Sequence, residues 1–255
     1  MNLTSRTGDV RRGTVGPLLG RAAAAEWGEL WAAVGGRLAR RRLAAVPLAL
    51  TATLLVLLFD LVQQLPGGAG FVERVGVVRA GLPLELELLR TPLSLFVPAL
   101  DLPVWGALAQ VLVVFAVAEI VLGRPLALFV AYAGTVAGTL YARVAVDVGP
   151  GGFLGLPATD ALVRDAGPSA AVVALAICAA WRARAWFTGA AVVALMGTEA
   201  AVLPNLAGLE HLAAIAAAVL IAALGEVFGG YWSRVLALAR AATETVRTAS
   251  GAAAR

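Results

Sequence analysis

Histidine, cysteine and lysine are almost or entirely missing from this chain of 255 residues, which has one histidine, one cysteine and no lysine. A zinc site takes several Cys, His or carboxylate ligands, so this composition leaves little for metal catalysis. The lone Cys178 can form no intrachain disulfide and is expected to pack as a small hydrophobe. The sequence also lacks a Walker A loop and a dinucleotide fingerprint. We therefore expect no metal and no other cofactor.

Charged residues are also scarce, at 14% of the chain, whereas hydrophobic residues make up 60%. These fractions and a mean hydropathy of +0.87 lie far from those of soluble domains and indicate an integral membrane protein. The 20 basic residues, all arginine, are scattered between apolar runs and do not form one patch. We therefore expect the lipid bilayer as a partner and no nucleic acid.

Six apolar segments, bounded by Arg, Pro and Gly, predict an all-α membrane domain over residues 46–229. The segments are 46–65, 104–122, 126–146, 168–181, 185–203 and 206–228. Residues 230–255 are predicted to form a helical, cytoplasmic C-terminal tail. Residues 1–45 are predicted to carry an amphipathic helix on the cytoplasmic surface, because apolar residues recur there at helical spacing. These residues are Trp27, Leu30, Trp31 and Val34.

The arginines are distributed unevenly over the connections between the segments. If the N-terminus is inside the cell, 15 of the 20 arginines fall on the cytoplasmic side. The five on the outside are Arg74, Arg79, Arg90, Arg143 and Arg164. Since arginine is retained on the cytoplasmic side, both termini are predicted to be cytoplasmic. The location that we expect is the plasma (inner) membrane.

The fourth segment is too short to cross a bilayer. Its 14 residues give roughly 21 Å of helix, against about 30 Å of hydrocarbon. Because the segment ends at Arg182 on the cytoplasmic side, its start is expected to lie inside the membrane, after a glycine-rich connection that dips into a wet cavity. Ser169 lies at that start, where the positive end of the helix dipole favours a developing anion.

The only histidine, His211, lies in the outer half of the sixth segment. Measured along the helices from the cytoplasmic side, Ser169 lies roughly 20 Å and His211 roughly 23 Å deep, so the two share a level. Stripes of alanine on both segments favour a close approach of the two helices. A serine and a histidine placed in this way have the chemistry of a nucleophile and its base. The alternatives are a helix-capping serine and a packed or interfacial histidine.

Four short motifs occur in an order that resembles a known family. They are AEIVLG (118–123), YAGTVAG (132–138), GPSA (167–170) and EHLAAIAAA (210–218). Together they resemble the rhomboid intramembrane serine proteases, which have Gly-x-Ser at the start of a short fourth helix and a catalytic histidine on the sixth. The resemblance covers about residues 46–228. It implies a six-helix rhomboid-like bundle with Ser169 as nucleophile and His211 as general base.

The chain departs from this family at residues that help active members to bind the oxyanion. Counted back from Glu119, the family's His, His and Asn fall on Pro98, Pro103 and Ala107, which have no side-chain donor. Loss of one such donor typically costs about 10²-fold to 10³-fold in rate. Alanines also stand where the family has glycines after the serine and the histidine, and the Trp-Arg signature of the first outer connection is absent.

Two functions follow from the resemblance and its gaps. The first is a divergent, weak serine protease that cleaves transmembrane or membrane-proximal peptide segments with the dyad of Ser169 and His211. The second is a catalytically inactive rhomboid-like protein that binds transmembrane helices of client proteins. The sequence leaves the oligomeric state open.

Charged residues in or near the segments have other expected roles. Glu119 is expected to anchor a loop by hydrogen bonds, and Arg143 can pair with Asp147 one turn further on. Asp60 and Glu199 are expected near the outer interface. A third hypothesis, a small transporter that uses Asp60, Glu119 and Glu199 as a polar path, is disfavoured because the sequence has no inverted repeats.

Overall fold

The computed structural model describes residues 12–253 except 101, 153 and 204, and the side chains of residues 20–229 within that range. The described part of the chain contains nine α-helices, two short 3-10 helices and no strand. The elements are α1 (Arg12–Arg41), η1 (Arg42–Ala45), α2 (Pro47–Gln63), α3 (Gly68–Gly76), α4 (Leu84–Ser94), α5 (Val104–Leu122), α6 (Arg124–Val148), η2 (Ala158–Leu162), α7 (Ser169–Ala183), α8 (Trp186–Val202) and α9 (Leu206–Ala253). The predicted all-α class is confirmed for these residues.

Three helices are long and apolar enough to cross a membrane: Val104–Leu122, Arg124–Val148 and Leu206–Gly229. A fourth span results if Gly20–Ala45 and Pro47–Gln63, which meet at an angle of 53°, form one broken helix. The other two apolar helices, α7 and α8, have 15 and 17 residues. Several potential spans thus indicate a membrane protein. The count of six spans, the plasma membrane and the orientation of the termini stay predictions.

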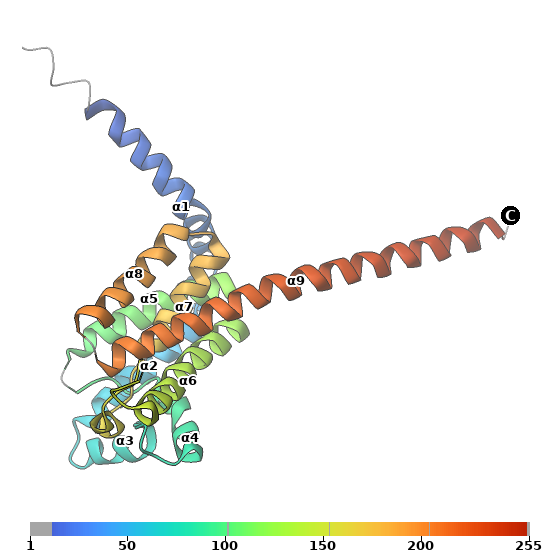
Figure 1. The fold of residues 1–255 in the computed structure, drawn as a ribbon. Helices are drawn as coiled ribbons and strands as arrows, with labels where there is room; N and C mark the ends of the chain where they lie inside the picture. Colours follow the sequence, from blue (N-terminus) through green and yellow to red (C-terminus); the bar gives the residue numbers. More distant parts are fainter. Residues whose placement is uncertain (1–11, 101, 153, 204, 254–255) are drawn as a thin grey trace, which may run out of the picture.

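The helix at the centre of the bundle is α7, which packs against α5, α6, α8 and α9 (Figure 1). Ten of its 15 residues are buried, whereas α8, also apolar and of similar length, buries only Ala200. A helix enclosed by other helices has its backbone hydrogen-bonded internally and its apolar surface covered by protein. Because α7 is enclosed by protein in this way, it can lie within the membrane although it is too short to cross the bilayer.

The helices α6, α7 and α9 approach one another closely at small residues. A Cβ atom on Gly134 of α6 would lie 2.5 Å from the Cβ of Ala174 and 3.7 Å from the Cβ of Ala214. A Cβ atom on Gly138 would lie 3.2 Å from the Cβ of Glu210. Such contacts need small side chains on the facing helices. Cys178 of α7 also donates a hydrogen bond of 3.4 Å to the carbonyl of Ala218 on α9, so the expected close approach of the fourth and sixth segments is confirmed.

The connection between α2 and α5 contains α3 and α4, which lie at one end of the bundle (Figure 1). From α4, Glu87 is fully buried, and it accepts a hydrogen bond of 2.8 Å from Arg143 of α6. The expected pair of Arg143 with Asp147 is therefore wrong. Asp147 is exposed, while the buried Glu87 carboxylate needs a charged partner, and this need decides which acid Arg143 contacts.

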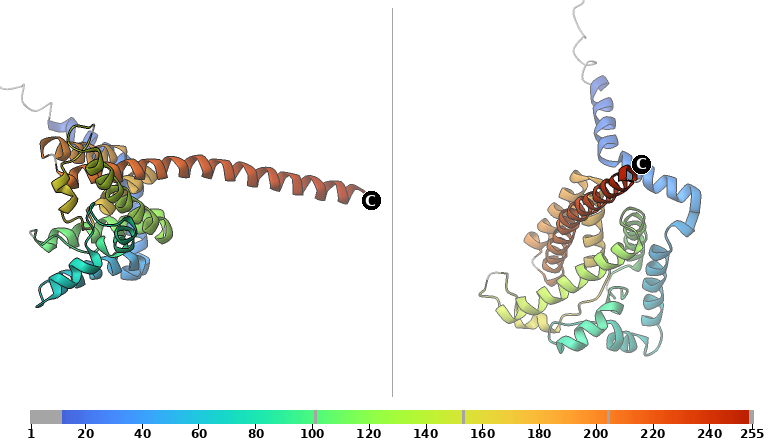
Figure 2. Two further views of the ribbon diagram at one scale, coloured as in Figure 1. Left: turned by 60° about the horizontal axis from the view of Figure 1, so that its bottom comes forward. Right: turned by 90° about the vertical axis from the view of Figure 1, so that its right-hand side faces the viewer.

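The two ends of the described chain are helical and project from the bundle away from α3 and α4 (Figures 1 and 2). The expected amphipathic helix is α1, although residues 1–11 of the predicted tail lie outside the described residues. Trp27 of α1 donates a hydrogen bond of 2.9 Å to Thr188 at the start of α8, so α1 contacts the bundle. At the other end, α9 continues to Ala253 without a break at residue 229.

Candidate functional site

Ser169 is the first residue of α7, and backbone hydrogen bonds fix the segment that precedes it. Val78 and Asp165 exchange two such bonds, of 3.0 and 2.9 Å, and the N–H of Gly167 donates to the carbonyl of Ser94 at 3.0 Å. Gly167 has a φ of +142°, a conformation that is open to glycine but strained for other residues. The turn into α7 therefore depends on this glycine and on contacts with the α3–α4 region.

The hydroxyl of Ser169 does not cap α7. The N-cap residue is Pro168, and no side-chain hydrogen bond caps the helix. The fourth segment was predicted to begin at Pro168, so α7 begins one residue later than predicted. Within the described part of the chain, no hydrogen bond engages the half-buried Ser169 hydroxyl. The helix-cap alternative therefore has no support in the geometry, and the hydroxyl is available to another group.

Ser169 lines an apolar cavity of about 320 Å³ between the start of α7 and the start of α5. The three positions at which the resemblance expects oxyanion donors, Pro98, Pro103 and Ala107, line the same cavity. The side chain of Gln110, one turn after Ala107, is the only amide among the lining residues. Gln110 was not predicted as a site residue, although it is the only polar residue between Val104 and Ala118.

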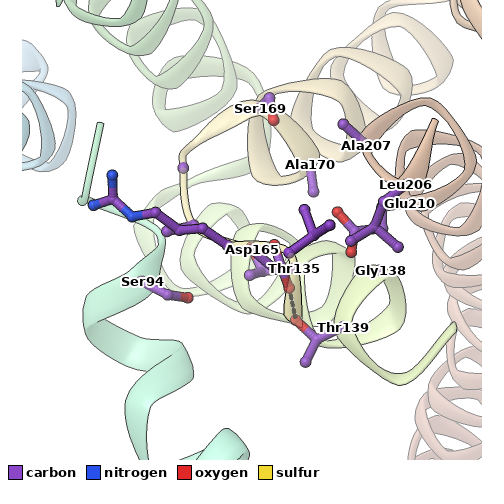
Figure 3. A pocket seen from close by; sticks show the side chains of 14 residues that line it. Ser94, Thr135, Gly138, Thr139, Asp165, Ser169, Ala170, Leu206, Ala207 and Glu210 are labelled. Carbon is purple, nitrogen blue, oxygen red and sulfur yellow. Dashed lines mark hydrogen bonds between the residues drawn. The ribbon is translucent and has the colours of Figure 1, made fainter. Parts of the chain in front are cut away.

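Ser169 also lines a second, polar cavity of about 90 Å³ on the side of α6 and α9 (Figure 3). Thr139 of α6 donates a hydrogen bond of 3.1 Å to Asp165 in this cavity, and Glu210 of α9 faces it. Burial raises the pKa of Asp165, in the connection before α7, to about 6. Ser169 thus lies between an apolar cavity and an acidic one.

His211 lies on α9 with only 8% of its surface exposed. Its Nδ1 atom is 3.4 Å from Oε2 of Glu199 on α8, whereas its Nε2 atom is buried and has no hydrogen-bond partner among the described residues. A carboxylate at Nδ1 favours the tautomer in which Nε2 is free to accept a proton. Glu199 therefore contacts the histidine itself, and this contact was not predicted from the sequence.

Ser169 and His211 are not joined by a hydrogen bond in the described structure, and His211 lines neither cavity, so their predicted common level stays a prediction. Ala174 of α7 and Ala214 of α9 both lie close to Gly134 of α6. Ser169 precedes Ala174 by five residues, and His211 precedes Ala214 by three. Catalytic hydrogen bonds are often long or unformed before substrate binds. The predicted dyad is thus neither formed nor excluded by this geometry.

Glu119 has the anchoring contacts that were expected of it. Its carboxylate is 2% exposed and accepts hydrogen bonds from the N–H of Ala49 at 3.0 Å and from Arg124 at 2.8 Å, so it ties the start of α2 to the turn between α5 and α6. Asp60 accepts a hydrogen bond from Gln64 one turn further along the chain. Glu199, the third carboxylate of the transporter hypothesis, contacts His211. The three carboxylates therefore contact separate partners and not one another.

Comparisons with protein-family models, with curated proteins and with solved structures found no match to this chain.

Proposed function

We propose that this protein is a divergent rhomboid-like serine protease that hydrolyses transmembrane or membrane-proximal peptide segments at a low rate. The observation that carries this proposal is the setting of Ser169, at the start of an enclosed helix and open to two cavities of opposite polarity. A peptide that lies across Ser169 can place apolar side chains on the α5 side and a polar one on the α6 side.

Each member of the site has a role in this reaction. The Oγ atom of Ser169 attacks the peptide carbonyl while Nε2 of His211 accepts its proton, and the resulting imidazolium gives that proton to the leaving amine. The Glu199 carboxylate, 3.4 Å from Nδ1, holds the ring and stabilises its charged form. The step requires His211 and Ser169 to move together when the peptide binds.

The low rate follows from the groups available to the oxyanion. Backbone N–H groups and the dipole at the start of α7 favour a negative charge near Ser169. The proline ring of Pro168 removes one N–H, and Pro98, Pro103 and Ala107 supply no side-chain donor to the shared cavity. The tetrahedral intermediate is therefore stabilised by fewer donors than in an efficient serine protease.

In the membrane, we propose that α2, α5, α6, α7, α8 and α9 form a six-helix rhomboid-like bundle in which α7 starts below the outer surface. An even number of crossings agrees with the way α1 and the end of α9 both leave the bundle away from α3 and α4 (Figure 1). The arginine distribution supports a cytoplasmic position for this side, and the location that we propose is the plasma membrane.

Labelling by a serine-reactive fluorophosphonate in native membranes tests the proposal. We expect weak labelling of the parent and none of Ser169→Ala, because the proposal makes the Ser169 hydroxyl the nucleophile and His211 its base. Ser233→Ala, a serine change in the C-terminal part of α9, is the matched control and should label as the parent does. Equal background labelling of all three proteins would contradict hydrolysis.

That outcome would favour the second function, a catalytically inactive rhomboid-like protein that binds client transmembrane helices. The absence of a side-chain donor at Pro98, Pro103 and Ala107 favours it, as does the unformed hydrogen bond between Ser169 and His211. The two cavities at Ser169 then hold a client segment without cleaving it.

Glu199→Gln is expected to lower kcat by about tenfold with little change in KM, because the amide no longer stabilises the imidazolium. The loss is smaller than for a fully buried acid, since the Glu199 side chain is 32% exposed. Glu199→Asp should recover part of kcat. Thr198→Ala is the control, because the Thr198 hydroxyl bonds only the carbonyl of Ala194. An unchanged kcat in Glu199→Gln would exclude this role.

A further inference from the structure

The polar cavity beside Ser169 brings together two carboxyl groups from different elements (Figure 3). Asp165 comes from the connection before α7 and Glu210 from the second turn of α9. The other polar side chains that line the cavity belong to Ser94, Thr135, Thr139, Arg164 and Ser169. Carboxylate and hydroxyl oxygens accept hydrogen bonds, so this lining is suited to a group that donates several of them.

Glu210 has no partner for its carboxyl group among the described residues, although it is only 8% exposed. Its Oε1 atom is fully covered by protein, and its side chain is directed into the cavity (Figure 3). A buried carboxylate without a partner is costly, and a charged partner of opposite sign is the strongest compensation. The unpaired carboxyl group of Glu210 is therefore suited to binding a positive group from outside the described chain.

The nearby arginines already have other partners. Arg143 pairs with Glu87 at 2.8 Å. Arg164 lines the cavity, but its guanidinium donates to Gln63 at 2.6 Å and lies 3.7 Å from Glu73. Neither forms an ion pair with Glu210 within the described residues. The cavity thus combines an unsatisfied acid with an opening toward Ser169.

A metal ion does not suit this cavity. Among the residues that were described, no three His, Cys, Asp or Glu side chains come together as a metal site. Magnesium and calcium bind several oxygen ligands at short range, and two carboxyl groups of which one is already bonded to Thr139 are a poor set. A volume of about 90 Å³ instead accommodates the end of one long side chain.

We propose that this cavity binds the ammonium or guanidinium group of a lysine or arginine side chain in the peptide that lies on Ser169, with Glu210 and Asp165 as its acceptors. The identity of the occupant as a peptide rests on the proposed function. The rest of the peptide segment then occupies the apolar cavity on the other side of Ser169. The two cavities together select a segment in which a basic residue interrupts an apolar run.

Peptide binding to the full-length Ser169→Ala protein in lipid vesicles tests this inference without cleavage. The probe is a synthetic transmembrane peptide of leucine and alanine in which one lysine is moved through the outer third. The matched probe has norleucine, an uncharged side chain of similar length, at the same position. We expect the lysine peptide to bind at least about tenfold more tightly at one position, since a hydrogen bond to a charged group is stronger than one between neutral groups.

Adding Glu210→Gln should abolish this preference, and adding Asp165→Asn should weaken it, so that the inference does not depend on the folding of one variant. Glu85→Gln removes the same charge from an exposed position of α4 and should leave the preference intact. Equal affinity for the two peptides at every position would overturn the inference, as would a lysine preference that survives in both cavity variants.

The result is separable from that of the proposed function. Labelling of Ser169 by the fluorophosphonate without a lysine preference contradicts only the cationic cavity. A lysine preference that depends on Glu210, without labelling, supports the cavity and contradicts hydrolysis.

Discussion

Ser169→Ala and His211→Ala are each expected to lower cleavage of a transmembrane reporter peptide by about 10⁴-fold or more, and the double variant is expected to be no slower than either single variant. The reason is that the two side chains of the proposed dyad act as one unit: the serine is a weak nucleophile without its base, and the base has no proton to take without the serine. The measurement is the initial rate of cleavage with purified protein in lipid vesicles.

A second replacement of the histidine separates chemistry from packing. His211 is 8% exposed, so alanine leaves a cavity at the contact between α8 and α9, whereas His211→Gln fills more of that space and still lacks a ring base. Both variants should lose activity equally. Losses that multiply in the double variant, or a His211→Gln protein that cleaves as fast as the parent, would show that Ser169 and His211 work independently.

Helix positions were predictable where the sequence marks both ends. Pro103 and Gly123 enclose the second apolar segment, and α5 has the predicted bounds, Val104–Leu122. The helix after residue 228 was also predicted, but its continuity with the last apolar segment was not. The chain becomes more polar after residue 228, but it stays rich in alanine, leucine and arginine, which favour helix, so the backbone continues to Ala253. A change of polarity marks a surface and need not end a helix.

The residues beside Ser169 were predictable, but the rotation of α9 was not. Ser169 shares a cavity with Pro98, Pro103 and Ala107, the positions obtained by counting from Glu119. Glu210 and His211 are adjacent and lie about 100° apart around α9. In the structure Glu210 faces Gly138 of α6 and His211 faces α8. The rotation of α9 about its axis depends on packing against these helices, so the residues of α9 alone do not predict it.

Contacts between residues far apart in the chain could not be predicted from the sequence either. The bond from Arg143 to Glu87 joins residues 56 positions apart, and spacing rules on one helix cannot find it. The contact of Glu199 with His211 joins two helices across a short connection. Both depend on how α4, α6, α8 and α9 are packed, because a buried acid selects its partner after the fold has brought the candidates together.

Ala107→Asn is expected to raise the rate of cleavage by as much as about 10²-fold, because it adds a side-chain amide to the cavity that Ala107 shares with Ser169. Removing one oxyanion donor typically costs about 10²-fold to 10³-fold, and adding one reverses part of that loss when the amide reaches the developing charge. The matched control is Ala107→Leu, which has nearly the same size as asparagine and no donor.

Gln110 makes this experiment sharper, because it is the only amide that already lines the cavity. If the introduced asparagine binds the oxyanion directly, Ala107→Asn should accelerate cleavage equally in the parent and in a Gln110→Leu background. An asparagine variant no faster than the leucine control would contradict oxyanion binding at position 107. A gain that disappears with Gln110→Leu would place the donor one turn further along α5, with the introduced asparagine acting only to orient it.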